Sequence, residues 1–108
     1  IAMLASAAKT RKLKIPDLKG ASFTISSLGA IGGKFFTPII NPPEAGILGL
    51  SKTFAKVVAT NDGFESREFL PISLSYDHRI INGVYAAQFV TQLGVALGDT
   101  SLMEKNFK

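Results

Sequence analysis

Polar and apolar residues alternate through the middle of the chain in a pattern typical of strands. Residues 47–60, "ILGLSKTFAKVVAT", are rich in apolar side chains, and residues 64–78, "FESREFLPISLSYDH", carry apolar side chains at every second position from Ile72 to Tyr76. Such alternation gives a strand one apolar face. Between the two runs lies Asp-Gly at residues 62–63, the dipeptide that most strongly favours a tight hairpin turn. We therefore predict two long antiparallel strands, with Pro71 at an edge or a bulge.

A different spacing follows towards the C-terminal end and predicts a helix. Asn82 is a preferred helix N-cap, and Gly98 with Asp99 is expected to end the helix. The apolar side chains between them recur at intervals of three and four residues, which places them on one stripe of a helix. These residues are Ala86, Phe89, Val90, Leu93 and Leu97.

Two further elements and a long loop are predicted before the hairpin. Residues 1–13 are mostly good helix formers, with basic residues near the C-terminal end, where they suit the helix dipole, and Pro16 is expected to close this helix. Residues 21–26 alternate in the manner of a strand. Residues 27–46 contain four glycines and three prolines and are expected to form mostly loop, which is long for a compact domain.

The order of helix, strand, long loop, long hairpin and helix predicts an α+β fold class, in which a long antiparallel hairpin has helices packed on one face. Two strands and two helices provide little area with which to shield one another from water. We therefore expect either an oligomer or a missing half of the domain to cover the remaining apolar surface.

Composition narrows the possible functions. The chain has 108 residues, of which 46% are hydrophobic, and this fits one domain or part of one. It has no cysteine, which excludes disulfides and thiolate chemistry, and its single histidine argues against a zinc site. No apolar run approaches the roughly 20 residues that span a bilayer. The first eight residues are apolar but lack a start methionine, so we expect a fragment of a longer chain and not a signal peptide.

The net charge of +4 is concentrated near the N-terminal end. Five of the 12 basic residues lie between Lys9 and Lys19, in "KTRKLKIPDLK". Such a cluster is compatible with a solvated helix end, with a patch that attracts anionic ligands, or with a nucleic-acid contact. The stretch is short and has no interleaved aromatic residues, which favours the first two interpretations. No nucleic-acid or membrane partner is expected.

The candidate chemical groups lie where strands are predicted to end. His78 ends a predicted strand, in a position from which rigid scaffolds often present functional side chains, although a lone histidine is most often structural or simply exposed. Asn82 is compatible with a simple cap, and Gly83 with a tight turn. Ser26 and Ser27 end another strand, where turn chemistry is an alternative to catalysis, and the chain has no Gly-x-Ser-x-Gly motif.

Three segments together resemble one known family. "SLSYDHRIINGVYAAQF" resembles the signature of the dihydrolipoyl acyltransferases of 2-oxo acid dehydrogenase complexes, which is His-x-x-x-Asp-Gly preceded by Ser, Tyr or Phe, and Asp. "SFTISSLGAIGG" is similar to the Phe-Thr-Ile-Ser segment of that family, and "FFTPIINPPEAGILGLSK" to its Thr-Pro-Ile block. The three segments occur in the family order, and the resemblance covers about residues 1–99. It is closest to the acetyltransferases of pyruvate dehydrogenase, although the third segment also suits succinyl or branched-chain relatives.

The resemblance implies a domain organisation and an assembly. Residues 1–108 would be the C-terminal half of the acyltransferase catalytic (core) domain, with the lipoyl and subunit-binding domains absent. The family fold is similar to that of chloramphenicol acetyltransferase, a trimer with active sites between subunits, and such trimers build cubic or icosahedral cores. The implied partners are other copies of the chain and the 2-oxo acid decarboxylase and dihydrolipoyl dehydrogenase components. The implied location is the bacterial cytoplasm or the mitochondrial matrix.

The resemblance also implies a reaction and residue roles. The reaction transfers an acyl group from an S-acyl-dihydrolipoyl arm, carried on a domain not present here, to coenzyme A. His78 would take the proton of the attacking thiol, for which a neutral imidazole is suited near pH 7. Ser26, in preference to Ser27, would donate a hydrogen bond to the oxyanion of the intermediate. Asn82 replaces the aspartate of the family motif and would, with Gly83, position the histidine loop.

No metal and no covalent acyl-enzyme are implied, and the cluster at Lys9–Lys19 would attract the nucleotide phosphates of coenzyme A. His78 of one subunit is expected to face Ser26 of a neighbour.

The alternative from another class is a non-catalytic structural core subunit of such a complex. The arguments for it are the absent first half and Asn82. Retention of His78 argues against that alternative.

Overall fold

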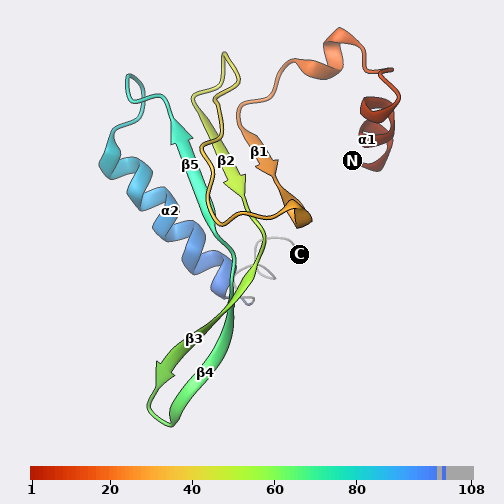
Figure 1. Ribbon diagram of the computed structural model, residues 1–108. Coiled ribbons are helices and arrows are strands. Elements are labelled where there is room, and N and C mark those ends of the chain that lie inside the picture. The colour runs from red at the N-terminus through yellow and green to blue at the C-terminus, as the bar shows by residue number, and fades with distance from the viewer. Residues whose placement is uncertain (100, 102–108) are drawn as a thin grey trace.

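The computed structural model of the chain describes residues 1–99 and 101 (Figure 1). It contains two α-helices, five strands in two sheets and two short 3-10 helices within these residues. In chain order the elements are α1 (Ala2–Lys9), η1 (Ile15–Leu18), β1 (Thr24–Ser27), η2 (Gly29–Ile31), β2 (Gly46–Leu50), β3 (Phe54–Thr60), β4 (Gly63–Phe69), β5 (Ile72–Tyr76) and α2 (Gly83–Gly98). The predicted α+β class is therefore confirmed, with differences in the first helix, in the bounds of β1, which was predicted at residues 21–26, and in the long hairpin.

The larger sheet has three strands in the order β1-β2-β5. β1 runs parallel to β2, and β2 runs antiparallel to β5. The register places Ser26 beside Gly49 and Gly49 beside Ser73, so these three residues lie in one row across the sheet. The central strand is also the most buried, as its "GILGL" composition suggests, because it pairs on both edges and is covered on both faces.

The predicted long hairpin is present but is divided into two parts. The inner part is the β2–β5 pair, and the outer part is a separate two-stranded sheet of β3 and β4 that projects from the body of the molecule (Figure 1). The predicted turn lies between Thr60 and Gly63, which pair with each other, and Gly63 adopts a φ of 124° that glycine tolerates best.

The continuity of the two strands was wrongly predicted. Pro71 has no N–H group to donate to a ladder, and pairing stops there. The break is bridged by Ser51, whose N–H donates to the Pro71 carbonyl oxygen at 3.2 Å.

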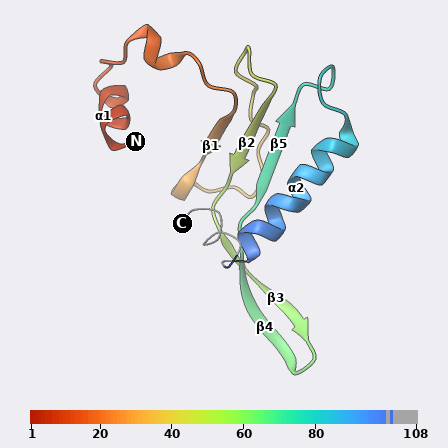
Figure 2. The ribbon, with the colours of Figure 1, turned by 180° about the vertical axis from the view of Figure 1, so that it is seen from behind.

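α2 agrees closely with the sequence prediction. It begins after Asn82 and ends at Gly98, and it packs along β5 on one face of the three-stranded sheet (Figures 1 and 2). Its buried residue is Ala86, and the Phe89 ring contacts the Phe23 ring just before β1 with centroids 6.1 Å apart. The apolar stripe predicted for this helix therefore faces the sheet near its first two turns.

α1 differs from the prediction in both length and position. It ends at Lys9 and not at residue 13, because Arg11 adopts a left-handed φ of 56° that a helix cannot continue. Pro16 lies within the following 3-10 helix and does not close α1. α1 has no buried residue and lies beyond the β1 edge of the sheet, on the side away from α2 (Figure 2). The expectation that both helices pack on one face was therefore wrong for α1.

The core formed by the described residues is small. The buried apolar side chains are Ile47 and Leu48 on β2 and Ala86 on α2, at 5–6% exposure. Large apolar side chains such as Phe64 on β4 and Val84 on α2 are instead exposed. The chain thus leaves much apolar surface exposed, which other protein surface would have to cover. This agrees with the expectation that two strands and two helices have too little area to shield one another from water.

Candidate active site

The connection between β5 and α2, residues 77–82, forms a tight turn with His78 on its outside. The Asp77 N–H donates to the carbonyl oxygen of Ala45, the residue before β2, at 2.8 Å, which ties the start of the turn to the neighbouring strand. The Asp77 carbonyl oxygen accepts from the N–H groups of Ile80 and Ile81 at 3.0 and 2.9 Å. The backbone on both sides of His78 is therefore fixed by hydrogen bonds, and the imidazole itself is exposed.

The Asp77 carboxylate closes the same turn through its side chain. Its Oδ1 accepts from the backbone N–H and the Nε of Arg79, both at 3.0 Å, and its Oδ2 accepts from Nη2 at 2.8 Å. The hydrogen bonds from the Arg79 side chain, then that from its backbone, hold the pKa of Asp77 down at about 2. The same ion pair raises the pKa of Arg79 above its usual range. The carboxylate is largely covered, whereas the Arg79 side chain is 89% exposed.

Asn82 caps α2, as predicted from the sequence. Its Oδ1 accepts from the Tyr85 N–H at 2.8 Å, which satisfies one of the N–H groups that have no partner within the helix. Gly83 does not have a positive φ, so the expectation that this glycine allows a tight turn was wrong. A Cβ there would lie 3.5 Å from the Tyr76 hydroxyl and 3.9 Å from His78 Nε2, so Gly83 instead keeps the space beside both rings open.

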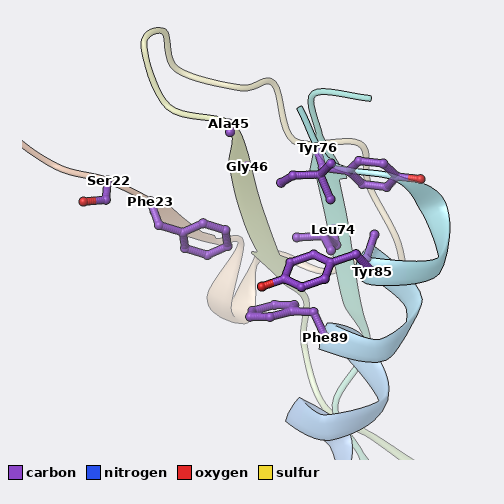
Figure 3. Close-up of a pocket in the computed structure, with 10 residues that line it drawn as sticks. Ser22, Phe23, Ala45, Gly46, Leu74, Tyr76, Tyr85 and Phe89 are labelled. Carbon is purple, nitrogen blue, oxygen red and sulfur yellow. The ribbon is translucent and has the colours of Figure 1, made fainter. Parts of the chain in front are cut away.

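Two hollows meet at Tyr76, whose ring lies beside the imidazole of His78 with centroids 5.6 Å apart. An apolar pocket of about 270 Å³ lies between the sheet and α2, and Tyr85 and Phe89 point into it from the helix (Figure 3). A more polar groove of about 510 Å³ holds His78 itself. The groove is lined by Ile40, Pro42, Pro43, Glu44, Tyr76, Asp77, His78, Arg79 and Ile80.

A further groove, of about 630 Å³, brings part of the N-terminal basic cluster near this region. It is lined by Lys19 among others and shares Pro42, Pro43 and Glu44 with the groove at His78. Glu44 is held in place between them, because its carboxylate accepts from Thr24 Oγ1 at 2.5 Å and from the Asn41 amide at 3.2 Å. Lys19 therefore lies along a surface continuous with the histidine groove.

The two candidate serines have different surroundings. Ser27 Oγ accepts from the Gly29 N–H at 3.2 Å, which is the turn role that serine often has at the end of a strand. Ser26 is half-buried in β1 beside Gly49, and its hydroxyl makes no hydrogen bond to another described residue. Ser27 therefore takes part in a turn, whereas the Ser26 hydroxyl has no partner among the described residues.

One chain does not bring Ser26 and His78 together. Ser26 lies in the row of Ser73, and five further residues at about 3.4 Å each, with two strand spacings of about 4.8 Å, give a separation of roughly 20 Å to His78. The faces differ as well. A Cβ on Gly49, in the same row, would approach Phe36 to 2.7 Å on the side away from α2, whereas His78 lies beside Tyr76 next to α2.

Two negative findings apply to the part of the chain that the structure describes. Residues 1–99 and 101 contain no group of three or more acidic, histidine or cysteine side chains placed to hold a metal ion. None of the helices in this part has the length and apolar character needed to cross a membrane.

Comparison with known proteins places the chain in a family. The model of the 2-oxoacid dehydrogenases acyltransferase family (catalytic domain) matches residues 1–104. The chain belongs to this family. The family predicted from the three sequence segments is thereby confirmed.

Among curated proteins, this chain is similar to dihydrolipoyllysine-residue acetyltransferase components of pyruvate dehydrogenase complexes. It is 53% identical over 97 residues to that of Buchnera aphidicola, covering 90% of the chain and 24% of the relative. It is also 53% identical over 96 residues to that of Pseudomonas aeruginosa, covering 89% and 18%. A succinyltransferase component from Rickettsia bellii is 49% identical over 90 residues, covering 83% and 22%. The chain thus spans a quarter or less of the length of these relatives.

Solved acyltransferase structures match the fold. A structure of the Azotobacter vinelandii dihydrolipoamide acetyltransferase gives a TM-score of 0.86 at 52% identity and covers 92% of this chain and 41% of that one. That study concerned the role of a serine, a histidine and an asparagine in the catalytic mechanism of the A. vinelandii enzyme. A structure of the cubic core of the pyruvate dehydrogenase multienzyme complex matches with the same TM-score, identity and coverage.

The ion pair of Asp77 with Arg79 was not predicted from the sequence. The signal was present, because an aspartate often accepts from the backbone N–H two residues later and so closes a turn. The pairing of Glu44 with Thr24 had no such local signal, because the two residues are 20 positions apart and meet only through the β1–β2 pairing.

Proposed function

We propose that this chain is part of an acyltransferase that moves an acetyl group from an S-acetyl-dihydrolipoyl arm to coenzyme A. The protein would also form the oligomeric core of a 2-oxo acid dehydrogenase complex. The observation that carries the proposal is a spacing. In the A. vinelandii enzyme the histidine under study follows the serine by 52 positions and precedes the asparagine by 4. Ser26, His78 and Asn82 have the same spacing here, within a region of 52% identity.

The proposed roles follow from the chemistry of each group. The exposed imidazole of His78 accepts the proton of the coenzyme A thiol as its sulfur attacks the thioester carbonyl carbon. The proton then passes to the departing dihydrolipoyl sulfur when the tetrahedral intermediate collapses. The Ser26 hydroxyl donates to the oxyanion of that intermediate, and Asn82 fixes the start of α2 and with it the histidine turn. The A. vinelandii enzyme also has an asparagine four positions after its histidine, which argues against the view that Asn82 marks a damaged site.

The active site is proposed to lie between chains. The separation of roughly 20 Å between Ser26 and His78 in one chain is too long for both to contact one thioester carbonyl, as strand rise and spacing require. His78 of one subunit would therefore meet Ser26 of a neighbour within a trimer, and trimers would build a larger core. The exposed apolar surface and the cubic core formed by a similar protein support this assembly.

The remaining parts of the proposal concern the whole protein. Residues 1–108 would be the C-terminal half of a catalytic domain with a fold similar to chloramphenicol acetyltransferase. The lipoyl arm would come from a domain outside the chain, and the decarboxylase and dihydrolipoyl dehydrogenase components would be partners. The bacterial relatives favour the bacterial cytoplasm. Lys19, on the surface continuous with the histidine groove, would attract the phosphates of coenzyme A.

Substitutions in the full-length, assembled protein test this proposal. His78→Ala is expected to lower acetyl transfer by about 100- to 10,000-fold, and Ser26→Ala by about 100- to 1,000-fold, with the particle intact by sedimentation. Ser27→Ala is the matched control, since Ser27 follows Ser26 on β1 and so points to the opposite face of the sheet, and it should stay within about threefold of the parent. Wild-type-like turnover in His78→Ala refutes the assignment. An intact native particle without any acetyl transfer would favour the structural core subunit instead.

A further inference from the structure

The residues on either side of His78 form an ion pair that also shapes the turn. Asp77 uses its N–H, its carbonyl oxygen and both carboxylate oxygens in hydrogen bonds, to Ala45, to the backbone after His78 and to Arg79. The Arg79 backbone N–H and guanidinium both donate to this carboxylate, so the three-residue segment with His78 at its centre is closed into a ring. The imidazole lies beside the Tyr76 ring and is exposed, so the backbone of this segment contributes to its placement.

The charges at the ion pair matter for a base at that position. A carboxylate beside an imidazole favours the protonated imidazolium, which cannot accept a proton from a thiol. A guanidinium bonded to the same carboxylate offsets that effect. The ion pair is bidentate at 2.8 and 3.0 Å, a geometry in which arginine holds a carboxylate firmly. The two charges therefore form a compact pair with little net charge.

Other charged and titratable groups around the histidine groove are few. The loop before β2 contributes Glu44, whose carboxylate is engaged by Thr24 and Asn41. β5 contributes the Tyr76 ring, and the first turn of α2 has no acidic residue. Asp77 and Arg79 directly flank His78 in the sequence, so a substitution of either residue changes the charge next to His78.

We propose that Asp77 and Arg79 are positioning residues for His78, which shape its turn and cancel each other's charge so that the imidazole works as a neutral base near pH 7. This inference rests on the proposed function, because it assigns the partners of the base that function requires. It extends that function, because it gives a reason why the backbone around His78 is fixed by hydrogen bonds and why an adjacent carboxylate does not disable the base.

The proposal predicts opposite shifts for the two single-charge variants. Arg79→Gln leaves the carboxylate uncompensated, so the acid limb of the kcat/KM profile should move to higher pH. Asp77→Asn keeps an oxygen that can accept the Arg79 N–H but leaves the guanidinium uncompensated, so the acid limb should move to lower pH. In a water-like dielectric a unit charge acting over about 4 to 8 Å is worth roughly 0.5 to 1 kcal/mol, so each shift should be about half a pH unit. The double variant should return to the parent position.

Two further readouts separate charge from shape. At 1 M salt the Debye length falls to about 3 Å, so both shifts should shrink while any conformational effect remains. Asp77→Ala removes the hydrogen bonds to the Arg79 N–H and guanidinium, and it should lower kcat by about 10- to 100-fold with KM little changed, as expected for a displaced catalytic group. The matched control is Arg67→Gln, which removes one positive charge from the exposed pair with Glu65 on β4 and should leave the profile unchanged.

The experiment measures pH profiles of acetyl transfer to coenzyme A in full-length, assembled protein for the parent, these variants and His78→Ala. Opposite, salt-sensitive shifts in the two single-charge variants support the proposal. Shifts in the same direction, no shifts, or an equal shift in Arg67→Gln would overturn it. If His78→Ala is active with an unaltered acid limb, the proposed function itself fails. If His78→Ala is inactive and the limbs do not move, the failure is confined to Asp77 and Arg79.

Discussion

Substitution of Asn82 distinguishes a helix cap from a group that touches the substrate. Asn82 Oδ1 accepts from the Tyr85 N–H at 2.8 Å, and replacing such a cap by alanine typically costs about 1 kcal/mol, within a range of about 0.5 to 2. Aspartate caps about as well as asparagine. Its charge near the positive end of the helix dipole would add about 0.3 to 1 kcal/mol. Asn82→Ala should therefore destabilise the protein by about 1 kcal/mol, and Asn82→Asp should leave its stability unchanged or slightly raised.

The same substitutions have distinct consequences for activity. We expect Asn82→Asp to retain acetyl transfer within about tenfold of the parent, because the cap and the turn are kept. Its acid limb should move to higher pH, because the new carboxylate near His78 favours the imidazolium. Asn82→Ala should lose more activity than Asn82→Asp, because fraying of the first turn of α2 loosens the connection that carries His78.

Thermal unfolding and steady-state acetyl transfer check both expectations in the full-length assembly, at one fixed protein concentration because assembly contributes to stability. A loss above about 100-fold in Asn82→Asp with unchanged stability would refute the cap as the source of the effect. The amide N–H₂ group of Asn82 would then be the part that matters. A large rise in activity in Asn82→Asp would show that asparagine impairs the site, and the structural core subunit would become the better interpretation.

Two further predictions concern the stability of the sheet and of the turn. Gly49→Ala should destabilise the protein by about 1 to 3 kcal/mol in chemical denaturation, because its Cβ would lie 2.7 Å from the Phe36 ring and 3.2 Å from Pro38. Unchanged stability would show that the loop with Phe36 and Pro38 does not pack on β2. The pKa of Asp77 is lowered to about 2 in the folded protein, whereas that of aspartate in an unfolded chain is about 3.9. The ion pair of Asp77 therefore stabilises the fold above about pH 4, and this contribution is lost as the pH falls towards 2. Asp77→Asn should therefore flatten the fall in stability between about pH 4 and 2, and an unaltered fall would contradict this.

Elements set by local residues were the ones that the sequence predicted well. Gly63 supplies the positive φ of 124° just after the hairpin loop, a conformation that glycine tolerates best, and Asn82 with an apolar stripe fixes the start and face of α2. The left-handed Arg11 that ends α1 had no such local signal, since arginine ordinarily continues a helix.

Features that depend on distant pairing could not be predicted from local patterns. The parallel pairing of β1 with β2 and its register decide where Ser26 lies, and a shift of one residue would turn that side chain to the other face of the sheet. The sequence therefore identified Ser26 and His78 as candidates, and its family resemblance implied that they meet between chains. Their separation within one chain became visible only through the register of the strands.

Mixed assemblies of two inactive variants test most directly the central claim that one site combines His78 of one chain with Ser26 of a neighbour. Full-length chains carrying His78→Ala and chains carrying Ser26→Ala would be mixed in equal amounts, dissociated and reassembled, with each variant reassembled alone as the control. In a symmetric trimer with shared sites, random mixing gives about a quarter of the sites an intact histidine and an intact serine. We therefore predict that acetyl transfer recovers to about 25% of that of the reassembled parent. Activity that stays at the sum of the two inactive controls, in particles confirmed to contain both chains, would contradict the account.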